Sequence, residues 1–260
     1  MRILNRVLAL LFPPRCASCN RLLDWYEAAF APTALCEACQ KEWEDACRAE
    51  CGVCHKRLSR CRCLTEELSR AHVADLGKLV YYRSGDKSSV SNRVIFSIKN
   101  NRDRRTAIWL ALQMREHAER IAERDGKENM LITYVPRQAR AIHESGTDQA
   151  RELASALSRL TGIECLRTVG RARGRAAVQK KLSPAQRISN AKKTYQPIAK
   201  ALRRVRGRTV ILIDDIVTTG ATAAACTRLL RKMGAARVHA LVVATDDVNR
   251  DEAVRPKEEK

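Results

Sequence analysis

Hydrophobic residues along the chain alternate between short continuous runs and longer amphipathic stretches. The run at residues 210–213 is apolar and rich in β-branched side chains, which is typical of a strand buried on both faces of a parallel sheet. Similar runs at residues 78–83 and 130–135 predict two more core strands, and residues 164–169 predict another.

Stretches with helical periodicity follow or separate these runs. Apolar residues recur on one face of residues 90–99, 104–123, 148–160 and 223–233, and Gly234 is suited to end the last of these helices. Strands that alternate with helices in this way predict an α/β fold with a parallel sheet.

A short polar segment follows the run at 210–213 and carries the clearest chemistry in the chain. Two carboxylates, Asp214 and Asp215, come first, and Val217, Thr218, Thr219, Gly220, Ala221 and Thr222 lead into the helix. A strand, a short loop and a helix bring backbone N–H groups, hydroxyls and the positive end of the helix dipole together, which suits a phosphate monoester. The carboxylates can accept hydrogen bonds from a diol or hold a hydrated Mg²⁺. The alternatives are an ordinary crossover whose strand ends in Asp-Asp, or an Asp-rich site of another phosphate-handling family.

A second loop, residues 136–149, also leads from a strand into a helix, where ligands of parallel sheets bind. It contains Arg137, Arg140 and Gly146, which could present cations and backbone N–H groups to a diphosphate. The alternative is a solvated basic loop.

The net charge of the chain favours a polyanionic partner. The 260 residues carry a formal charge of +20, and the segment from Cys165 to Ile213 has fourteen Lys and Arg residues and no acidic one. Part of this segment fits neither secondary-structure period, so we expect a basic lid over a phosphate ligand or an arm that binds nucleic acid. Its candidate residues are Arg171, Arg173, Gln179, Arg187 and Asn190.

Cysteines define a second module at the amino-terminal end of the chain. Nine of the eleven lie within the first 63 residues. Eight of them form closely spaced pairs, which suggests two structural Cys₄ zinc sites: Cys16, Cys19, Cys36, Cys39, Cys51, Cys54, Cys61 and Cys63. The pairs can combine in sequence or in an interleaved cross-brace, and Cys47 has no assigned role. A disulfide framework needs an oxidising compartment, and a redox Cys-x-x-Cys usually occurs singly, so zinc is favoured.

The expected organisation is a small module followed by a larger domain. The apolar run at residues 3–12 is too short to span a bilayer and favours an amphipathic helix, and we expect no transmembrane segment and a cytoplasmic protein. The predicted parts are residues 1–64 for the helix and zinc-ribbon module, 65–77 for a linker, 78–245 for the α/β domain and 246–260 for a flexible tail.

The segment at 210–222 resembles the phosphoribosyl pyrophosphate (PRPP) motif of type I phosphoribosyltransferases: hydrophobic residues, two acidic residues, then a Thr/Gly-rich loop. This resemblance implies that Asp214 and Asp215 bind the ribose 2′- and 3′-hydroxyls, directly or through Mg²⁺. It also implies that residues 217–222 surround the 5′-phosphate.

Nearly the whole chain resembles the ComF family of competence-associated proteins, in which a double zinc ribbon precedes a phosphoribosyltransferase domain. The matching segments are Phe12-Pro13-Pro14-Arg15-Cys16, Phe96-Ser97-Ile98-Lys99, Val135-Pro136 with Arg140 and residues 146–150, and a run containing Arg171, Arg173, Gln179, Leu182, Ser183, Arg187 and Asn190. The chain has Gly146-Thr147-Asp148-Gln149 where the family usually has Gly-Phe-Asn-Gln, which removes an aromatic ring and adds a negative charge near the expected diphosphate.

The resemblance implies a role in natural transformation, with single-stranded DNA and proteins of DNA uptake or recombination as partners. Two hypotheses follow. In the first, the chain binds PRPP or a related phosphoribosyl ligand with Mg²⁺, and no residue identifies a nucleophile. In the second, it is a non-catalytic adaptor that binds single-stranded DNA through its basic segment and retains a vestigial PRPP pocket. A third idea is a zinc-thiolate redox switch.

Overall fold

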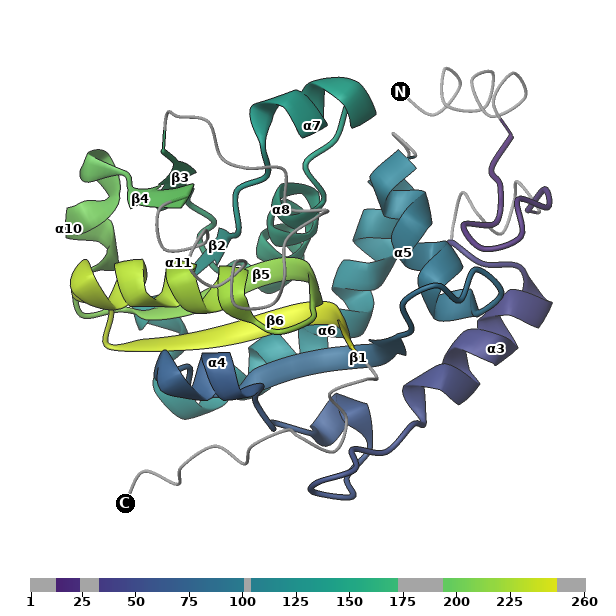
Figure 1. Ribbon diagram of the computed structural model, residues 1–260, viewed down its shortest axis with the longest axis horizontal. Helices are drawn as coiled ribbons and strands as arrows, with labels where there is room; N and C mark the ends of the chain where they lie inside the picture. Colours follow the sequence, from purple (N-terminus) through teal and green to yellow (C-terminus); the bar gives the residue numbers. More distant parts are fainter. Residues whose placement is uncertain (1–12, 24–32, 101–103, 173–193, 247–260) are drawn as a thin grey trace.

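A four-stranded parallel sheet lies at the centre of this protein, described here by a computed structural model (Figure 1). Its strand order is β1 (Leu76–Tyr82), β6 (Arg237–Asp246), β5 (Thr209–Val217) and β2 (Met130–Tyr134). The predicted α/β class is confirmed, and β6 is a strand beyond those predicted. The structure describes residues 13–23, 33–100, 104–172 and 194–246.

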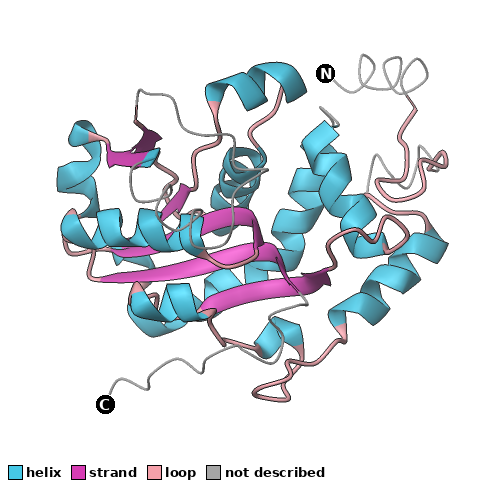
Figure 2. Ribbon diagram, viewed as in Figure 1, coloured by secondary structure: helices cyan, strands magenta, loops and turns pink. Residues whose placement is uncertain are grey.

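Helices cover both faces of the sheet (Figure 2). The α-helices are α3 (Glu37–Cys47), α4 (Glu66–Arg70), α5 (Val90–Asn100), α6 (Arg104–Asp125), α7 (Ala139–Ser145), α8 (Gln149–Thr161), α10 (Leu202–Val205) and α11 (Ala221–Lys232). Short 3₁₀ turns lie at Leu58–Arg60, Lys127–Asn129 and Ala199–Ala201. The helices predicted at residues 90–99, 104–123, 148–160 and 223–233 thus form within a few residues of their expected bounds. The helix predicted at residues 3–12 lies outside the described residues.

Alternation along β5 divides the core into two layers. Ile211 and Ile213 pack into the cluster that includes residues of α5, α6 and α8, whereas Val210 and Leu212 pack into the cluster with α4 and α11. All four side chains are at most 1% exposed. A strand with both faces covered is apolar at most positions, which is why this run lacks the polar alternation of a half-exposed strand.

The strand predicted at residues 164–169 is not a full member of the sheet. The chain runs beside β2 only briefly, where Ile132 N donates to Glu164 O (2.8 Å) and Leu166 N donates to Ile132 O (2.9 Å). It then turns away into β3 (Val169–Arg171), which pairs with β4 (Tyr195–Pro197) in a separate antiparallel ribbon. The local pattern was strand-like, but the pairing partner was set by tertiary contacts.

Residues 65–77, expected to be a linker, contain α4 and the start of β1. Leu68 on α4 is fully buried against α11 and β5 residues, and Thr65 caps the helix by accepting a hydrogen bond from Leu68 N (3.4 Å). This segment is packed into the α/β core. The boundary between the two parts of the chain stays a prediction.

Candidate functional site

The two acidic residues of the predicted PRPP motif lie where β5 extends beyond β2. Pairing between these strands ends at Ile213 and Tyr134, while β5 continues along β6 as far as Val217. Asp214 and Asp215 are partly exposed at this edge. Each accepts a hydrogen bond from the next backbone amide, at 3.0 Å for Asp214 Oδ1 and 2.8 Å for Asp215 Oδ1. These bonds hold the carboxylates at the carboxyl end of the sheet.

The loop after β5 turns directly into α11. Gly220 is the N-cap of α11 and has φ of 82°, in the left-handed region, where a glycine avoids the steric cost that other residues meet. Because the N-cap is glycine, it has no side-chain oxygen to satisfy the first amides of the helix. The hydroxyl-bearing Thr218 and Thr222 flank this turn and are partly exposed. Free amides at a helix N-terminus are suited to anions, so residues 217–222 stay the predicted phosphate-binding segment.

Helix α4 supports the back of this loop. Thr65 Oγ1 donates a hydrogen bond to Thr219 O at 3.0 Å. A β-carbon at position 220 would lie 2.4 Å from Thr65 Oγ1 and 2.9 Å from Leu68 Cγ. The loop therefore needs glycine both for its backbone conformation and for the close approach of α4, a contact that no local sequence pattern indicates.

Replacement of Gly220 by alanine is expected to lower the free energy of unfolding by about 2–3 kcal/mol, because strain at a left-handed position of about 1–2 kcal/mol adds to a steric clash. Urea denaturation measures this change. Gly85→Ala is the matched control, since Gly85 has φ of 86° and a β-carbon added there would meet nothing within 4 Å. Equal losses in the two variants would contradict the role of α4.

Arg171 lies over the same edge from the β3–β4 ribbon. Its Nη1 donates to the hydroxyl of Tyr195 (3.1 Å), and its guanidinium carbon lies 5.1 Å from the centre of that ring. Its Nη2 is buried and has no hydrogen-bond partner among the described residues. Burial raises the pKa of Tyr195, and the charge of Asp214 nearby adds to this rise. Arg171 and Tyr195 therefore contact each other directly, and the charge of Asp214 acts on Tyr195. Arg173, Gln179, Arg187 and Asn190 lie outside the described residues.

The predicted diphosphate loop is more structured than expected, because residues 139–145 form α7. Arg137 Nη1 donates to Ser145 Oγ (2.8 Å), Thr147 O (3.0 Å) and Gln149 Oε1 (2.7 Å). This side chain holds the two ends of the loop together. A polar residue at each end of a loop was the sequence signal that could have indicated such a clamp.

The other two predicted residues of this loop have different surroundings. Arg140 pairs with Glu144 on the outer side of α7 (2.8 Å), with its side chain 89% exposed. Gly146 ends α7 with φ of 73°. The loop lies at the same sheet edge as Asp214, since Val135 N donates to Ile213 O (3.0 Å). Arg140 and Gly146 stay predicted diphosphate residues on that basis alone.

The unusual Thr147-Asp148 pair has a local structural role. Asp148 is the N-cap of α8 and accepts a hydrogen bond from Arg151 N (3.4 Å), and burial raises its pKa. Thr147 Oγ1 accepts from Gln149 Nε2 (2.9 Å), and Gln149 Nε2 also approaches Ile98 O (3.4 Å). The loop is thereby attached to the end of α5.

The eight paired cysteines form two groups, each of which could hold a metal ion. Their sulfur atoms lie within 4.8 Å of one another in each group. A tetrahedral site with Zn–S bonds of about 2.3 Å requires S···S distances of roughly 3.8 Å, so small adjustments suffice. The groups are Cys16, Cys19, Cys36 and Cys39, and Cys51, Cys54, Cys61 and Cys63. The pairs thus combine in sequence, and Cys47 lies outside both groups.

The first halves of the two groups repeat the same turn. Asn20 N donates to Cys16 O, and His55 N donates to Cys51 O, both at 2.9 Å. Asn20 and His55 both have positive φ, and a short antiparallel bridge closes each turn. Such a knuckle directs two sulfurs to one point. The identical Cys-x-x-Cys spacing was the sequence signal for this duplication.

Without a bound metal, the thiols within each group have unequal pKa values. Burial raises the pKa of Cys39 to about 12 and that of Cys61 to about 11. In contrast, hydrogen bonds from neighbouring backbone and thiol groups outweigh burial and lower the pKa of Cys16 and of Cys51 to about 7. Four deprotonated sulfurs this close require a bound cation, and a Cys₄ donor set is suited to zinc.

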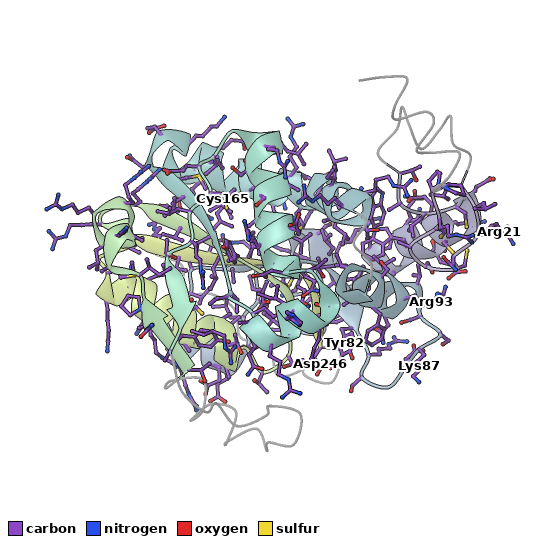
Figure 3. The ribbon with its side chains drawn as sticks, turned by 90° about the horizontal axis from the view of Figure 1, so that it is seen from above. Arg21, Tyr82, Lys87, Arg93, Cys165 and Asp246 are labelled. Atoms are coloured by element: carbon purple, nitrogen blue, oxygen red, sulfur yellow. The ribbon has the colours of Figure 1, made fainter. Side chains whose placement is uncertain are left out.

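Both groups are joined firmly to the α/β domain. Trp43 on α3 packs against Trp109 on α6, with ring centres 5.0 Å apart. Arg93 on α5 donates to Ser18 Oγ (2.7 Å) and pairs with Glu42 (2.9 Å), and Figure 3 shows Arg93 at the same end of the molecule as Arg21. The second group is held by buried Lys78, whose Nζ donates to Cys63 O (2.7 Å).

No helix in the described ranges is long and apolar enough to cross a membrane.

Comparisons with known proteins agree with this architecture. A family model described as phosphoribosyl transferase domain matches residues 141–259. Competence protein F of Haemophilus influenzae is 29% identical over 225 residues, which cover 85% of this chain and 92% of that protein.

Three solved structures are similar to about half of the chain, each with a TM-score of 0.31. An allosteric regulatory enzyme of purine biosynthesis is 22% identical over 50% of this chain and 25% of its own. Glutamine PRPP amidotransferase from B. subtilis is 23% identical over the same shares. This chain thus spans a quarter of the length of those two enzymes. The protein TT1426 from Thermus thermophilus is 24% identical over 54% of this chain and 73% of its own.

The chain's similarity to Competence protein F along most of its length, its match to a phosphoribosyl transferase domain and its two cysteine groups together fit a ComF-like protein with a phosphoribosyltransferase domain.

Proposed function

We propose that this protein binds PRPP or a related phosphoribosyl compound, together with Mg²⁺, at the carboxyl edge of β5 and acts in DNA uptake during natural transformation. The strongest support for this proposal comes from the surroundings of Arg171. A buried guanidinium nitrogen without a partner among the described residues is costly unless a ligand satisfies it. The same Arg171 side chain contacts Tyr195, on which the charge of Asp214 acts. At the nearby start of α11 the N-cap Gly220 has no side chain, and Ala221 N donates to Thr219 Oγ1 (3.4 Å).

In this proposal each element of the site contacts one part of the ligand. Asp214 and Asp215 accept hydrogen bonds from the ribose hydroxyls, and residues 217–222 bind the 5′-phosphate through backbone amides and threonine hydroxyls. Arg171 places a positive charge over the same ligand. Mg²⁺ supplies charge neutralisation for a diphosphate when bound. Arg137 positions the neighbouring loop, and Arg140 and Gly146 border the diphosphate.

The two cysteine groups are proposed to hold one zinc ion each, in a structural role, within a cytoplasmic protein. A reducing compartment keeps free thiols available as ligands. Transferase activity is left outside the proposal, because no described side chain is placed as a nucleophile or general base for an acceptor.

Calorimetric titration of the full chain with PRPP, with and without Mg²⁺, tests the ligand. Wild type is expected to bind with Mg²⁺. The Asp214→Asn/Asp215→Asn variant is expected to lose about 100-fold in affinity, since each charged hydrogen bond contributes about 1.5–3 kcal/mol. Arg171→Lys keeps the positive charge but removes Nη2, and its affinity for PRPP is expected to fall about tenfold. Glu119→Gln, an exposed change on α6, is the control. Absence of PRPP binding by wild type at millimolar concentration would overturn the proposal.

The adaptor hypothesis is tested by adding a labelled single-stranded oligonucleotide to the same variants. Retained DNA binding and transformation in the Asp214→Asn/Asp215→Asn variant would favour an adaptor with an unused pocket. A steep dependence of DNA binding on salt concentration is expected if the basic segment contacts several phosphates.

A further inference from the structure

A cavity of about 1010 Å³ lies at the opposite end of the sheet from Asp214. It is bordered by the second cysteine group, by α4, and by the first residues of β6, which starts at Arg237. The strands are parallel, and Thr209 at the beginning of β5 pairs with Arg237. This cavity is therefore formed by the amino-terminal ends of the strands, whereas the PRPP motif lies at their carboxyl ends.

The lining of this cavity has one sign of charge. Seven Lys and Arg residues line it, and no Asp or Glu of the described chain does. Three of them lie near the second cysteine group, and the others lie on α4, on α6, at the end of α11 and at the start of β6. They are Lys56, Arg60, Arg62, Arg70, Arg124, Arg231 and Arg237. Arg62, Arg70, Arg124 and Arg237 also pair with carboxylates outside the lining, which offsets part of this charge. A bound polyanion would neutralise the remaining positive potential of the cavity.

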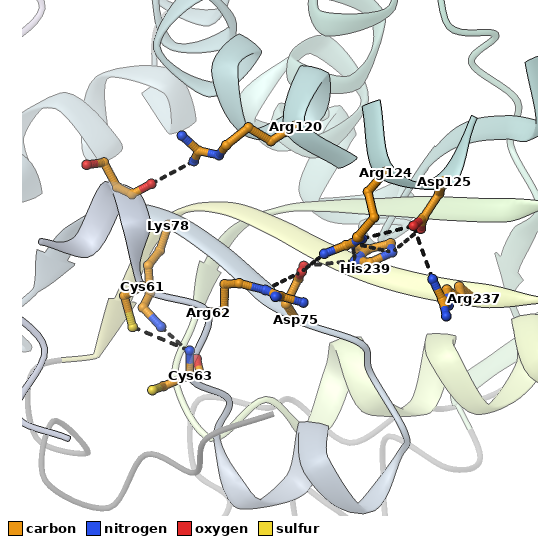
Figure 4. A network of polar contacts seen from close by, with 11 residues as sticks. Cys61, Arg62, Cys63, Asp75, Lys78, Arg120, Arg124, Asp125, Arg237 and His239 are labelled. Carbon is orange, nitrogen blue, oxygen red and sulfur yellow. Dashed lines mark hydrogen bonds and ion pairs between the residues drawn. The ribbon is translucent and has the colours of Figure 1, made fainter. Parts of the chain in front are cut away.

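Two buried carboxylates beneath the lining hold three of the guanidinium groups in place (Figure 4). Asp75 pairs with Arg62 at 2.9 Å, and Asp125 pairs with Arg124 at 2.9 Å and with Arg237 at 3.1 Å. The two acids are only 7% and 2% exposed. The arginine side chains thus lose little further rotamer freedom on binding a ligand, which favours affinity.

A fully buried histidine joins the two carboxylates. His239 Nδ1 lies 2.8 Å from Asp75 Oδ1, and its Nε2 lies 3.0 Å from Asp125 Oδ2. A histidine between two acids fixes both of them, and therefore fixes the arginines that they hold. This network joins the residue before β1 to the end of α6 and to β6, so the positive surface is attached to the central sheet and to a long helix.

The types of side chain that line the cavity favour phosphate groups over nucleic-acid bases. Arginines present planar pairs of N–H donors that match phosphate oxygens. Proteins that hold single-stranded nucleic acid usually add aromatic side chains on which bases stack, and no Phe, Tyr or Trp of the described residues lines this cavity. The volume is that of a small-molecule site, about 300–1,000 Å³ in typical proteins. The lining is thus suited to phosphates and not to bases.

We propose that this cavity is a second anion site, which binds a short linear oligophosphate. The phosphate chain can belong to inorganic triphosphate or to a nucleoside triphosphate, because the basic side chains of the lining would contact only the phosphates that both ligands share. Binding there is independent of the β5 loop.

Titration calorimetry of the full chain with inorganic triphosphate, at fixed ionic strength and without Mg²⁺, tests this site. The cavity variant is Arg60→Gln/Arg231→Gln, which removes one cation from each wall. The control is Arg48→Gln/Arg115→Gln, which removes the same charge from exposed helix pairs outside the cavity. The cavity variant is expected to bind at least tenfold more weakly, and the control less than threefold. The Asp214→Asn/Asp215→Asn variant is expected to bind as wild type does.

ATP and a twelve-residue oligothymidine are titrated in parallel. Affinity for ATP similar to that for triphosphate supports recognition of phosphates alone, while ATP binding at least tenfold tighter than triphosphate binding would overturn it. Tighter binding of the oligonucleotide than of triphosphate, with equal sensitivity to the cavity variant, would also overturn the proposal and assign the surface to nucleic acid. Equal losses in cavity and control variants, or no triphosphate binding, would overturn it as well. Unfolding curves without ligand verify that the variants are folded.

Discussion

Replacement of Cys61 by serine is expected to halve the metal content of the protein, from two zinc ions per chain to one. The free energy of unfolding should fall by about 3 kcal/mol or more, since a structural zinc contributes about 10–16 kcal/mol in small domains and one of four ligands is lost. The core around this group is small. Its buried residues are Cys51, Leu58, Cys61 and Cys63, so the metal has to supply most of the local stability.

Cys47→Ser is the matched control, because Cys47 lies outside both groups and is only partly buried. It should keep two zinc ions. Metal content is measured by elemental analysis, and stability is measured by chemical denaturation with and without chelator. Equal metal content in the two variants would show that the second cysteine group is not a zinc site. Release of zinc by mild oxidation at neutral pH would instead support a redox switch.

Replacement of Asp75 by alanine is expected to lower the free energy of unfolding by about 3–5 kcal/mol, because it removes one partner from a buried ionic network. His239 would be left with one of its two carboxylates, and Arg62 and Arg124 would lose their contacts with Asp75. Asp45→Ala is the control. Asp45 pairs with Arg48 at the surface, where both side chains are more than half exposed, and its loss should cost less than about 1 kcal/mol.

The same network should make this difference depend on pH. Burial lowers the pKa of His239, but hydrogen bonds to Asp125 and Asp75 outweigh it and raise the pKa above its usual value. A raised histidine pKa contributes stability that is complete below about pH 6.5 and lost as pH rises through the folded value. The pKa values of its two carboxylate partners shift in the opposite direction. Despite burial, the pKa of Asp75 falls to about 2 through His239, Arg62 and Arg124, and that of Asp125 is lowered through His239 and Arg124.

Lowered carboxyl pKa values contribute stability above about pH 4 that is lost as pH falls toward about 2. The difference in unfolding free energy between wild type and Asp75→Ala should therefore be greatest between about pH 4 and 6.5 and decrease on either side. Denaturation curves across this range measure it. A difference that is constant from about pH 3 to 9 would contradict a charged His239.

Several features of the candidate site could be read from local sequence. The apolar run before Asp214 and the small residues after Asp215 encode a strand, a turn and a helix in immediate succession. The cysteine pairs are similarly local, and their spacing predicts metal-binding knuckles. Arg137 was expected to face a diphosphate, and its Nη1 also joins Ser145 and Gln149 of its own loop, which are close to it in the sequence. Other features depend on residues far apart in the chain.

Residues 65–77 and the basic cavity illustrate why such features cannot be predicted from sequence patterns. Thr65 meets Thr219 across 154 positions, and His239 meets Asp75 across 164. No periodicity relates such positions, because their contact depends on which faces of which elements pack together. A charged residue that looks like a solvated surface group in the sequence can be buried and paired once the sheet forms.

The α/β class, the strand, turn and helix around Asp214 and the eight paired cysteines could be predicted from the amino-acid sequence, because each depends on residues close together in the chain. The sequential pairing of the cysteines, the support of the phosphate loop by α4 and the convergence of seven basic residues on one cavity became visible only in the folded molecule. These depend on the packing of distant elements, where the burial of apolar faces brings polar groups together that local patterns leave unrelated.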